Sequence, residues 1–200
     1  TFKPAPENHG YQIRRTDLEG APIVEALAEN VINTQRGTVV GKKDVQISTI
    51  EHAMAALYAW EVDNCLIEVD APEFPILDGS AHPFSEGIRS VGLTEQNAPR
   101  DYYIVRHKME VKDEKTGSSL TILPDDRFSM NVLIDFDSPV LSNQYATLSD
   151  LSQFADEIAA SRTFVFVREI EMLLRNGLIK GGDLDNAIVI YDREMPQAEL

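Results

Sequence analysis

Hydrophobic and polar residues alternate along several short stretches of the chain, which is typical of β-strands with one buried face. The longest such stretch covers residues 128–136, where Phe128, Phe136 and every second residue between them are apolar. We expect this strand to place its apolar face on a core. The same reasoning, together with flanking turn residues, predicts strands at 11–15, 45–47, 65–69, 103–111, 120–123, 163–167 and 187–191.

Four other stretches are bounded by residues that start or stop helices, and they predict helices at 48–60, 84–91, 149–160 and 168–176. Ser48 is expected to cap the first helix, with Glu51 placed three residues later as in a capping box. Ser149 is expected to cap the third helix, and Gly177 to stop the fourth.

The polar stretch 94–101 contains Pro99 and divides the chain into two predicted domains. The first domain covers residues 1–97 and carries the helix with Glu51, and the second covers residues 101–200. In each half the strands come before the helices. We therefore expect an α+β fold, with each domain a two-layer sandwich of a sheet and helices, rather than a doubly wound parallel sheet.

Composition and charge narrow the class of protein. The 200 residues include 33 acidic and 18 basic side chains, a formal net charge of −15 that argues against nucleic acid or an anionic membrane as a partner. No apolar run approaches the roughly 18–20 residues of a membrane-spanning helix, and no signal-peptide pattern opens the chain. The single cysteine, Cys65, fits a reducing compartment, so a cytoplasmic location is expected. No obligate protein partner is evident.

The most informative of the four histidines is His52, which follows Glu51 at the start of the predicted helix 48–60. Small residues share its helix face, so a ligand or another backbone can approach closely; these are Ala55, Ala56 and Ala59. An imidazole beside a carboxylate suits a metal ligand next to a general base. The capping box explains Glu51 without catalysis, and on the residues alone this structural interpretation is favoured over the catalytic one. The other three, His9, His82 and His107, read as surface or strand residues.

A second candidate cluster joins the predicted helix 149–160 to the strand 163–167. Thr163 offers a hydroxyl among aromatic residues, the composition of an apolar pocket with one directed polar group. A buried strand with a hydrogen-bonded threonine would explain the same residues equally well.

Taken in order, these segments resemble the zinc-dependent UDP-3-O-acyl-N-acetylglucosamine deacetylases of lipid A synthesis. The resemblance is carried by Ile47-Ser48-Thr49-Ile50-Glu51-His52, Asp63-Asn64, the stretch from Pro72 to Ala81, Arg162-Thr163-Phe164 and the stretch from Asp183 to Val189. It covers essentially the whole chain. Residues 180–190 look most like the branch whose deacetylase is fused to a 3-hydroxyacyl-carrier-protein dehydratase.

The resemblance implies two α+β domains with the active site between them and a nucleotide-sugar substrate that carries an acyl chain. His52 matches a ligand of Zn²⁺, Glu51 the general base, and Thr163 the hydroxyl that stabilises the oxyanion. Phe164 matches an aromatic residue near the sugar, and residues 165–191 match an inserted β-α-β unit that forms the passage for the acyl chain.

Several motifs of that family are not found in this sequence. They are its opening G-L-H-T-G segment, its H-K-x-x-D helix with two further zinc ligands, and a later histidine that assists catalysis. A catalytic zinc needs three protein ligands. We therefore expect this chain to be a fragment that binds zinc weakly and is inactive alone, whereas the intact protein is an active zinc-dependent deacetylase. The alternative is a non-catalytic acidic module that holds a lipid or a partner helix.

Overall fold

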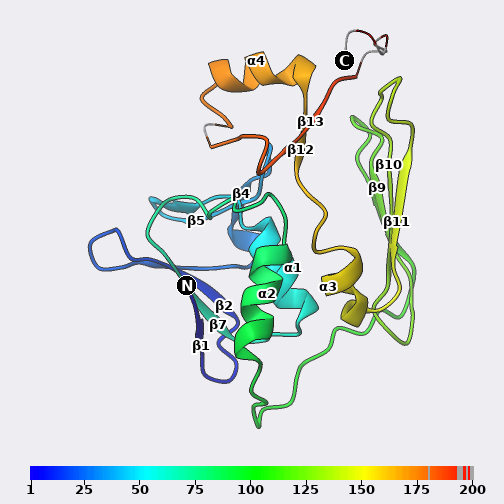
Figure 1. Cartoon of the computed structure of the whole chain (residues 1–200). Helices are drawn as coiled ribbons and strands as arrows, with labels where there is room; N and C mark the ends of the chain where they lie inside the picture. Colours follow the sequence, from blue (N-terminus) through cyan, green and yellow to red (C-terminus); the bar gives the residue numbers. More distant parts are fainter. Residues whose placement is uncertain (180, 193–195, 197, 199–200) are drawn as a thin grey trace.

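The computed structural model describes residues 1–179, 181–192, 196 and 198. Lys180 and part of the end of the predicted domain 101–200 therefore lie outside the described residues. The chain forms both helices and several separate small sheets, so the predicted α+β class is confirmed (Figure 1).

The first sheet has four strands in the order β1-β7-β2-β3. Their bounds are β1 Phe2–Pro4, β2 Tyr11–Arg15, β3 Ile23–Glu25 and β7 Cys65–Val69. Strand β7 pairs antiparallel with β1 and parallel with β2, and β2 pairs antiparallel with β3. Ile13 of β2 is in register with Ile67 of β7, and both side chains are fully buried, which fixes the register by placing their shared face on the core.

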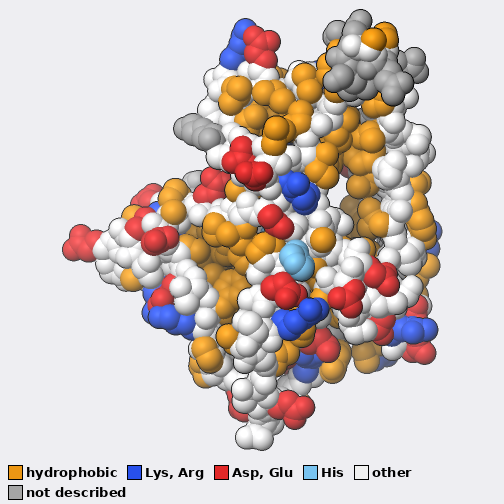
Figure 2. Space-filling view, in the orientation of Figure 1, with side chains coloured by type: hydrophobic (Ala, Val, Ile, Leu, Met, Phe, Trp, Pro, Cys, Tyr) orange, Lys and Arg blue, Asp and Glu red, His pale blue; other side chains and the backbone are white. Residues whose placement is uncertain are grey.

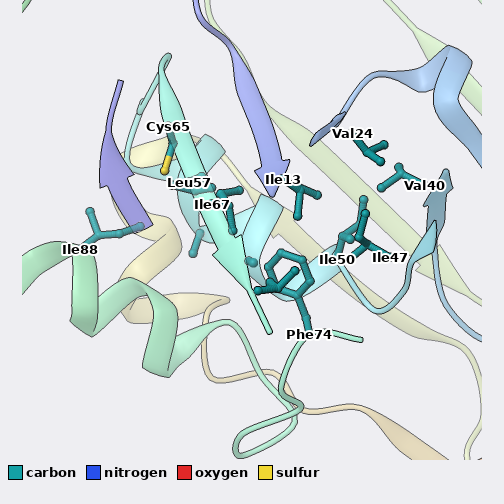
Figure 3. Packing of buried hydrophobic residues seen from close by; sticks show 13 residues of the cluster. Ile13, Val24, Val40, Ile47, Ile50, Leu57, Cys65, Ile67, Phe74 and Ile88 are labelled. Carbon is teal, nitrogen blue, oxygen red and sulfur yellow. The ribbon is translucent and has the colours of Figure 1, made fainter. Parts of the chain in front are cut away.

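Two helices complete the first core, α1 (Glu51–Ala59) and α2 (His82–Val91). They pack against each other, and Leu57 of α1 and Ile88 of α2 reach the side chains of the sheet (Figure 3). Between the two helices the indole N–H of Trp60 donates a 2.7 Å hydrogen bond to the hydroxyl of Ser85. The predicted helix 84–91 is thus confirmed, beginning two residues earlier at His82.

A second, three-stranded sheet has the order β4-β5-β6 and lies beside this core. Its strands are β4 Val31–Asn33, β5 Val39–Lys42 and β6 Val45–Ile47, and the 3₁₀-helix η1 (Ala28–Asn30) leads into β4. Val40 of β5 and Ile47 of β6 pair in register and belong to the same buried cluster as the first sheet (Figure 3).

The predicted start of the helix at Ser48 is wrong. Helix α1 begins at Glu51, Ile50 is its N-cap, and no side chain caps it. Ser48 instead forms an isolated parallel bridge with Glu73, with its N–H bonded to the carbonyl of Pro72 at 2.9 Å. Thr49 follows with φ +59°, a left-handed backbone that interrupts a helix. The capping-box explanation of Glu51 therefore fails.

Residues 92–108 contain no helix or strand, and two antiparallel hairpins follow them. Their strands are β8 Met109–Lys112, β9 Ser119–Ile122, β10 Met130–Ile134 and β11 Gln144–Leu148. The predicted strand 103–111 is thus much shorter than expected. The alternation around 128–136 correctly predicts a strand, but Phe128, Met130 and Ile134 are exposed, so the expectation that this face lies on a core is wrong.

The predicted helix 149–160 divides into the 3₁₀-helix η2 (Leu151–Gln153) and the short α3 (Phe154–Glu157). Asp150, rather than Ser149, caps it by accepting the N–H of Ser152. Phe154 belongs to a second buried cluster, whose other members are Ala81, Leu148 and Ala159. Ala55 and Ala59 of α1 pack against this cluster, as expected for a small-residue face approached by another segment, whereas Ala56 lies in the first core.

The last described elements are β12 (Phe164–Phe166), α4 (Val167–Arg175) and β13 (Ile188–Ile190). The two strands pair in parallel, so the three elements form a β-α-β unit. The predicted helix 168–176 is confirmed, and Gly177, with φ +69°, follows its end as expected. In Figure 1 this unit lies above the N-terminal end of α1.

Candidate functional site

Glu51 lies in the first turn of α1 and is half-buried. Its Oε1 accepts the backbone N–H of Thr38, from the loop between β4 and β5. A Cβ built on Gly37 would lie 3.5 Å from the same oxygen, so the loop passes directly over the carboxylate. One carboxylate oxygen is thereby held by a backbone donor that no short-range sequence pattern indicated.

His52 follows Glu51 on the same turn and is also half-buried. Within the described part of the chain, no group of three or more His, Cys, Asp or Glu side chains is placed to hold a metal ion. A tetrahedral catalytic zinc site needs three protein ligands. His52 is thus a single candidate ligand, and the described residues do not form a zinc site by themselves.

Thr163 lies directly before β12, and its backbone is fixed on both sides. Its N–H donates to the carbonyl of Gly79 at 2.7 Å, and its carbonyl accepts the N–H of Ile188 at 2.9 Å. The side chain is half-buried, and these two backbone bonds fix where the hydroxyl lies.

Arg162 fastens the same region to the turn that contains Asp78 and Gly79. Its Nε donates to the carbonyl of Asp78 at 2.9 Å, and its Nη2 to the carbonyl of Leu184 at 3.1 Å. The Asp78 carboxylate in turn accepts the N–H and hydroxyl of Ser80, at 3.0 and 2.8 Å. The turn at Asp78 and Gly79 thus holds both Arg162 and the backbone of Thr163.

Phe164 is partly exposed and belongs to an aromatic cluster. Its ring centroid lies 5.2 Å from that of Phe136 and 5.8 Å from that of Phe166, in edge-to-face arrangements. Phe136 follows β10, so the cluster ties the β10–β11 hairpin to the β-α-β unit. This cluster begins at the residue that follows Thr163 in the chain.

The Glu51–His52 pair and the Thr163–Phe164 pair stand on separate elements, and no hydrogen bond joins them in the part of the chain that is described. The two regions are connected by an ion pair of 2.6 Å between Arg36, in the loop over Glu51, and Glu169 in the first turn of α4. The guanidinium lowers the pKa of Glu169 below its ordinary value. Sequence reasoning missed Arg36 and Thr38, because only the fold brings their loop to Glu51.

Comparison with known proteins identifies the family to which this chain is similar. The family described as "LpxC: UDP-3-O-acyl N-acetylglycosamine deacetylase" matches residues 1–199. The chain belongs to this family. The family membership expected from the sequence is thereby confirmed.

LpxC relatives are similar along nearly the whole chain. The "Bifunctional enzyme LpxC/FabZ" of Bacteroides thetaiotaomicron is 62% identical over 98% of the chain, and that of Porphyromonas gingivalis is 62% identical over 100%. The "UDP-3-O-acyl-N-acetylglucosamine deacetylase" of Myxococcus xanthus is 43% identical over 95% of the chain. The chain spans 43% of each bifunctional relative and 60% of the Myxococcus protein. It therefore corresponds to part of an LpxC protein.

The chain also presents an apolar surface on the β-α-β unit that follows Thr163. Met172 and Leu174 of α4 are more than half exposed, and Leu184 is exposed in the loop before β13. Figure 2 shows apolar side chains gathered over α4 and along the hairpins to its right. Among the described residues, no helix has the length and apolar composition needed to cross a membrane.

Proposed function

We propose that the full-length protein containing this chain removes the acetyl group from UDP-3-O-acyl-N-acetylglucosamine, a step of lipid A synthesis. The observation that carries the proposal is the Glu51 carboxylate, which has one oxygen held by the Thr38 N–H and stands next to a candidate metal ligand. Membership of the LpxC family supports the same reaction. The similarity to LpxC/FabZ proteins supports a bifunctional protein that also carries a dehydratase.

Each site residue has a proposed role that follows from its surroundings. Glu51 acts as the general base, because its second carboxylate oxygen is left to accept a proton from the attacking water. Thr163 donates its hydroxyl to the oxyanion that forms at the acetamide carbonyl, since backbone bonds on both sides preorganise it. Phe164 packs near the sugar as part of the aromatic cluster.

We also propose that the full-length enzyme depends on Zn²⁺, with His52 as one ligand and the others supplied by residues that this chain does not contain. A bound zinc ion lowers the pKa of its water to about 7, which would make a nucleophile available at neutral pH. The acyl chain of the substrate is expected to lie along the β12–α4–β13 unit, whose exposed apolar residues suit a hydrocarbon.

Substitution of Glu51 tests the proposal in the full-length protein. Glu51→Gln keeps an oxygen that can accept the Thr38 N–H but removes the base, so acetate release from the substrate should be lost while the melting temperature is nearly unchanged. Glu61→Gln, just after the same helix, is the matched control and should retain activity. Full activity of Glu51→Gln would overturn the assignment and favour the non-catalytic binding module.

The zinc proposal has its own test in the same protein. A chelator should abolish acetate release and added Zn²⁺ should restore it. Metal analysis of His52→Ala should show less bound zinc than the unsubstituted protein. Unchanged zinc content in His52→Ala would remove His52 from the ligand set without affecting the proposed reaction.

A further inference from the structure

Arg36 connects the loop over Glu51 to the β-α-β unit. It lies two residues before Thr38, and its Nη2 is 2.6 Å from Oε1 of Glu169, with side-chain exposures of 41% and 26%. The pair is therefore partly shielded from water, and a single contact joins two elements that are remote in sequence. Both residues lie outside the motifs that carried the family resemblance.

Arg36 is directly followed in the chain by the two residues that contact Glu51. Arg36 has φ +61°, in the left-handed region that residues other than glycine rarely adopt. Gly37 and Thr38 follow at once, and these are the residues that cover Glu51 and bind its Oε1. A shift of Arg36 therefore moves the donor that fixes the carboxylate.

Glu169 is held at the other end of the contact. Its second oxygen, Oε2, accepts the N–H of Phe166 at 3.5 Å, and Phe166 stacks edge-on with Phe164. The guanidinium of Arg36 keeps the pKa of Glu169 low, so the carboxylate is ionised at neutral pH. Contacts thus run from the aromatic cluster beside Thr163 through Glu169 and Arg36 to the loop on Glu51.

We propose that Arg36 is a positioning residue: its ion pair with Glu169 sets the β4–β5 loop so that Thr38 holds the Glu51 carboxylate in the orientation of a general base. The inference rests on the proposed function of Glu51. It adds that the Arg36–Glu169 ion pair links two parts of the site. One is the loop that orients the base, and the other is the β-α-β unit expected to receive the acyl chain.

The test uses Arg36→Ala, Glu169→Gln and the double variant of the full-length protein. Glu169→Gln is chosen because it keeps an oxygen for the Phe166 N–H. Arg36→Ala should lower kcat about tenfold with little change in KM, because misplacing a catalytic group by even 1 Å costs up to about 10²-fold. The double variant should be no slower than the slower single variant, since both changes remove the same contact. Arg36→Lys should recover part of the rate, because lysine keeps the positive charge that pairs with Glu169.

A second readout does not depend on activity. Hydrogen exchange at the Thr38 amide should become faster in Arg36→Ala. Lys112→Ala is the control, because Lys112 pairs with Glu114 outside both the loop over Glu51 and the β-α-β unit, and both side chains are exposed. It should change neither kcat nor the exchange of Thr38.

The outcomes separate the two proposals. Unchanged kcat or unchanged Thr38 exchange in Arg36→Ala would overturn the positioning role, as would single effects that multiply in the double variant. If the unsubstituted full-length protein releases no acetate while Thr38 exchange still depends on Arg36, the deacetylase proposal fails and the structural coupling stands without a catalytic role.

Discussion

The backbone of Gly79 lies directly against the backbone carbonyl of Asn186, with no room for a side chain between them. Gly79 has φ +80°, and its own carbonyl accepts the N–H of Thr163. Asn186 is buried, and its amide oxygen accepts the N–H of Asp183. Both the loop before β13, at Asn186, and the residue before β12, Thr163, therefore contact the Asp78–Gly79 turn.

Gly79→Ala should weaken the packing of the β12–α4–β13 unit against the Asp78–Gly79 turn. The added Cβ would overlap the carbonyl oxygen of Asn186, and alanine disfavours the left-handed backbone, so we expect a loss of about 1–3 kcal/mol in the free energy of unfolding. Denaturant unfolding of the full-length protein measures this loss. Gly87→Ala is the matched control: Gly87 lies in α2 with open space at its Cβ, so alanine should be neutral or stabilise by about 0.5–1 kcal/mol.

Thr163→Val should remove the proposed oxyanion donor while keeping the shape of the side chain. We expect kcat to fall by about 10²–10³-fold with a small change in KM, the usual cost of losing one such donor. Thr163→Ser restores a hydroxyl at the same position and should recover much of the rate. A valine variant as active as the unsubstituted enzyme would show that the hydroxyl has no part in the reaction.

Tyr11 should make the stability of the first core depend on alkaline pH. Burial, followed by the charge of Asp63, raises the pKa of Tyr11 to about 12, and its hydroxyl donates to the carbonyl of Val62. In the unfolded chain a tyrosine titrates near about 10. From about pH 10 to 12 the unfolded state thus releases a proton that the folded state retains, so the free energy of unfolding falls as pH rises.

Tyr11→Phe tests this assignment. The variant should lose about 0.5–1.5 kcal/mol at neutral pH, because the hydrogen bond to Val62 is removed. The stability difference between the two proteins should shrink above about pH 10. A constant difference across that range would show that Tyr11 titrates normally in the folded state.

Zinc binding should differ between this chain and the full-length protein. Since the described residues place no three ligands together, we expect weak zinc binding by the 200-residue chain and stoichiometric binding by the full-length protein. Dialysis followed by metal analysis measures both. Tight, stoichiometric zinc in the 200-residue chain would contradict the proposed division of the ligands.

Sequence patterns predicted the elements best where the residues that decide them are close along the chain. The strands at 11–15 and 65–69 and the helix that ends before Gly177 depend on local alternation or a local stop signal. The start of α1 could not be predicted in this way. Ser48 has the chemistry of a cap, but its backbone pairs with the segment at Glu73, a partner that only the tertiary structure supplies.

In the candidate site, too, local sequence patterns identified residues but not the tertiary contacts they make. The structure places Glu51 and His52 in the expected helix and Phe164 in the expected strand, with Thr163 directly before it, and the roles assigned to them remain predictions. The sequence also showed that residues 128–136 share an apolar face without showing what covers it. Periodicity tells which side chains point the same way, whereas burial depends on what packs against them. The donor on Glu51 and the Arg36–Glu169 pair were missed for the same reason.

The strand order β1-β7-β2-β3 also bears on how the protein is made. During synthesis β2 and β3 can pair as soon as both have left the ribosome, since they are neighbours in the chain. Strand β1 emerges before both of them but pairs with β7, so it must wait for residues 65–69. Non-local pairing of this kind is slow and leaves strand edges open to misassembly. The four-stranded first sheet can therefore be completed only once Val69 has emerged.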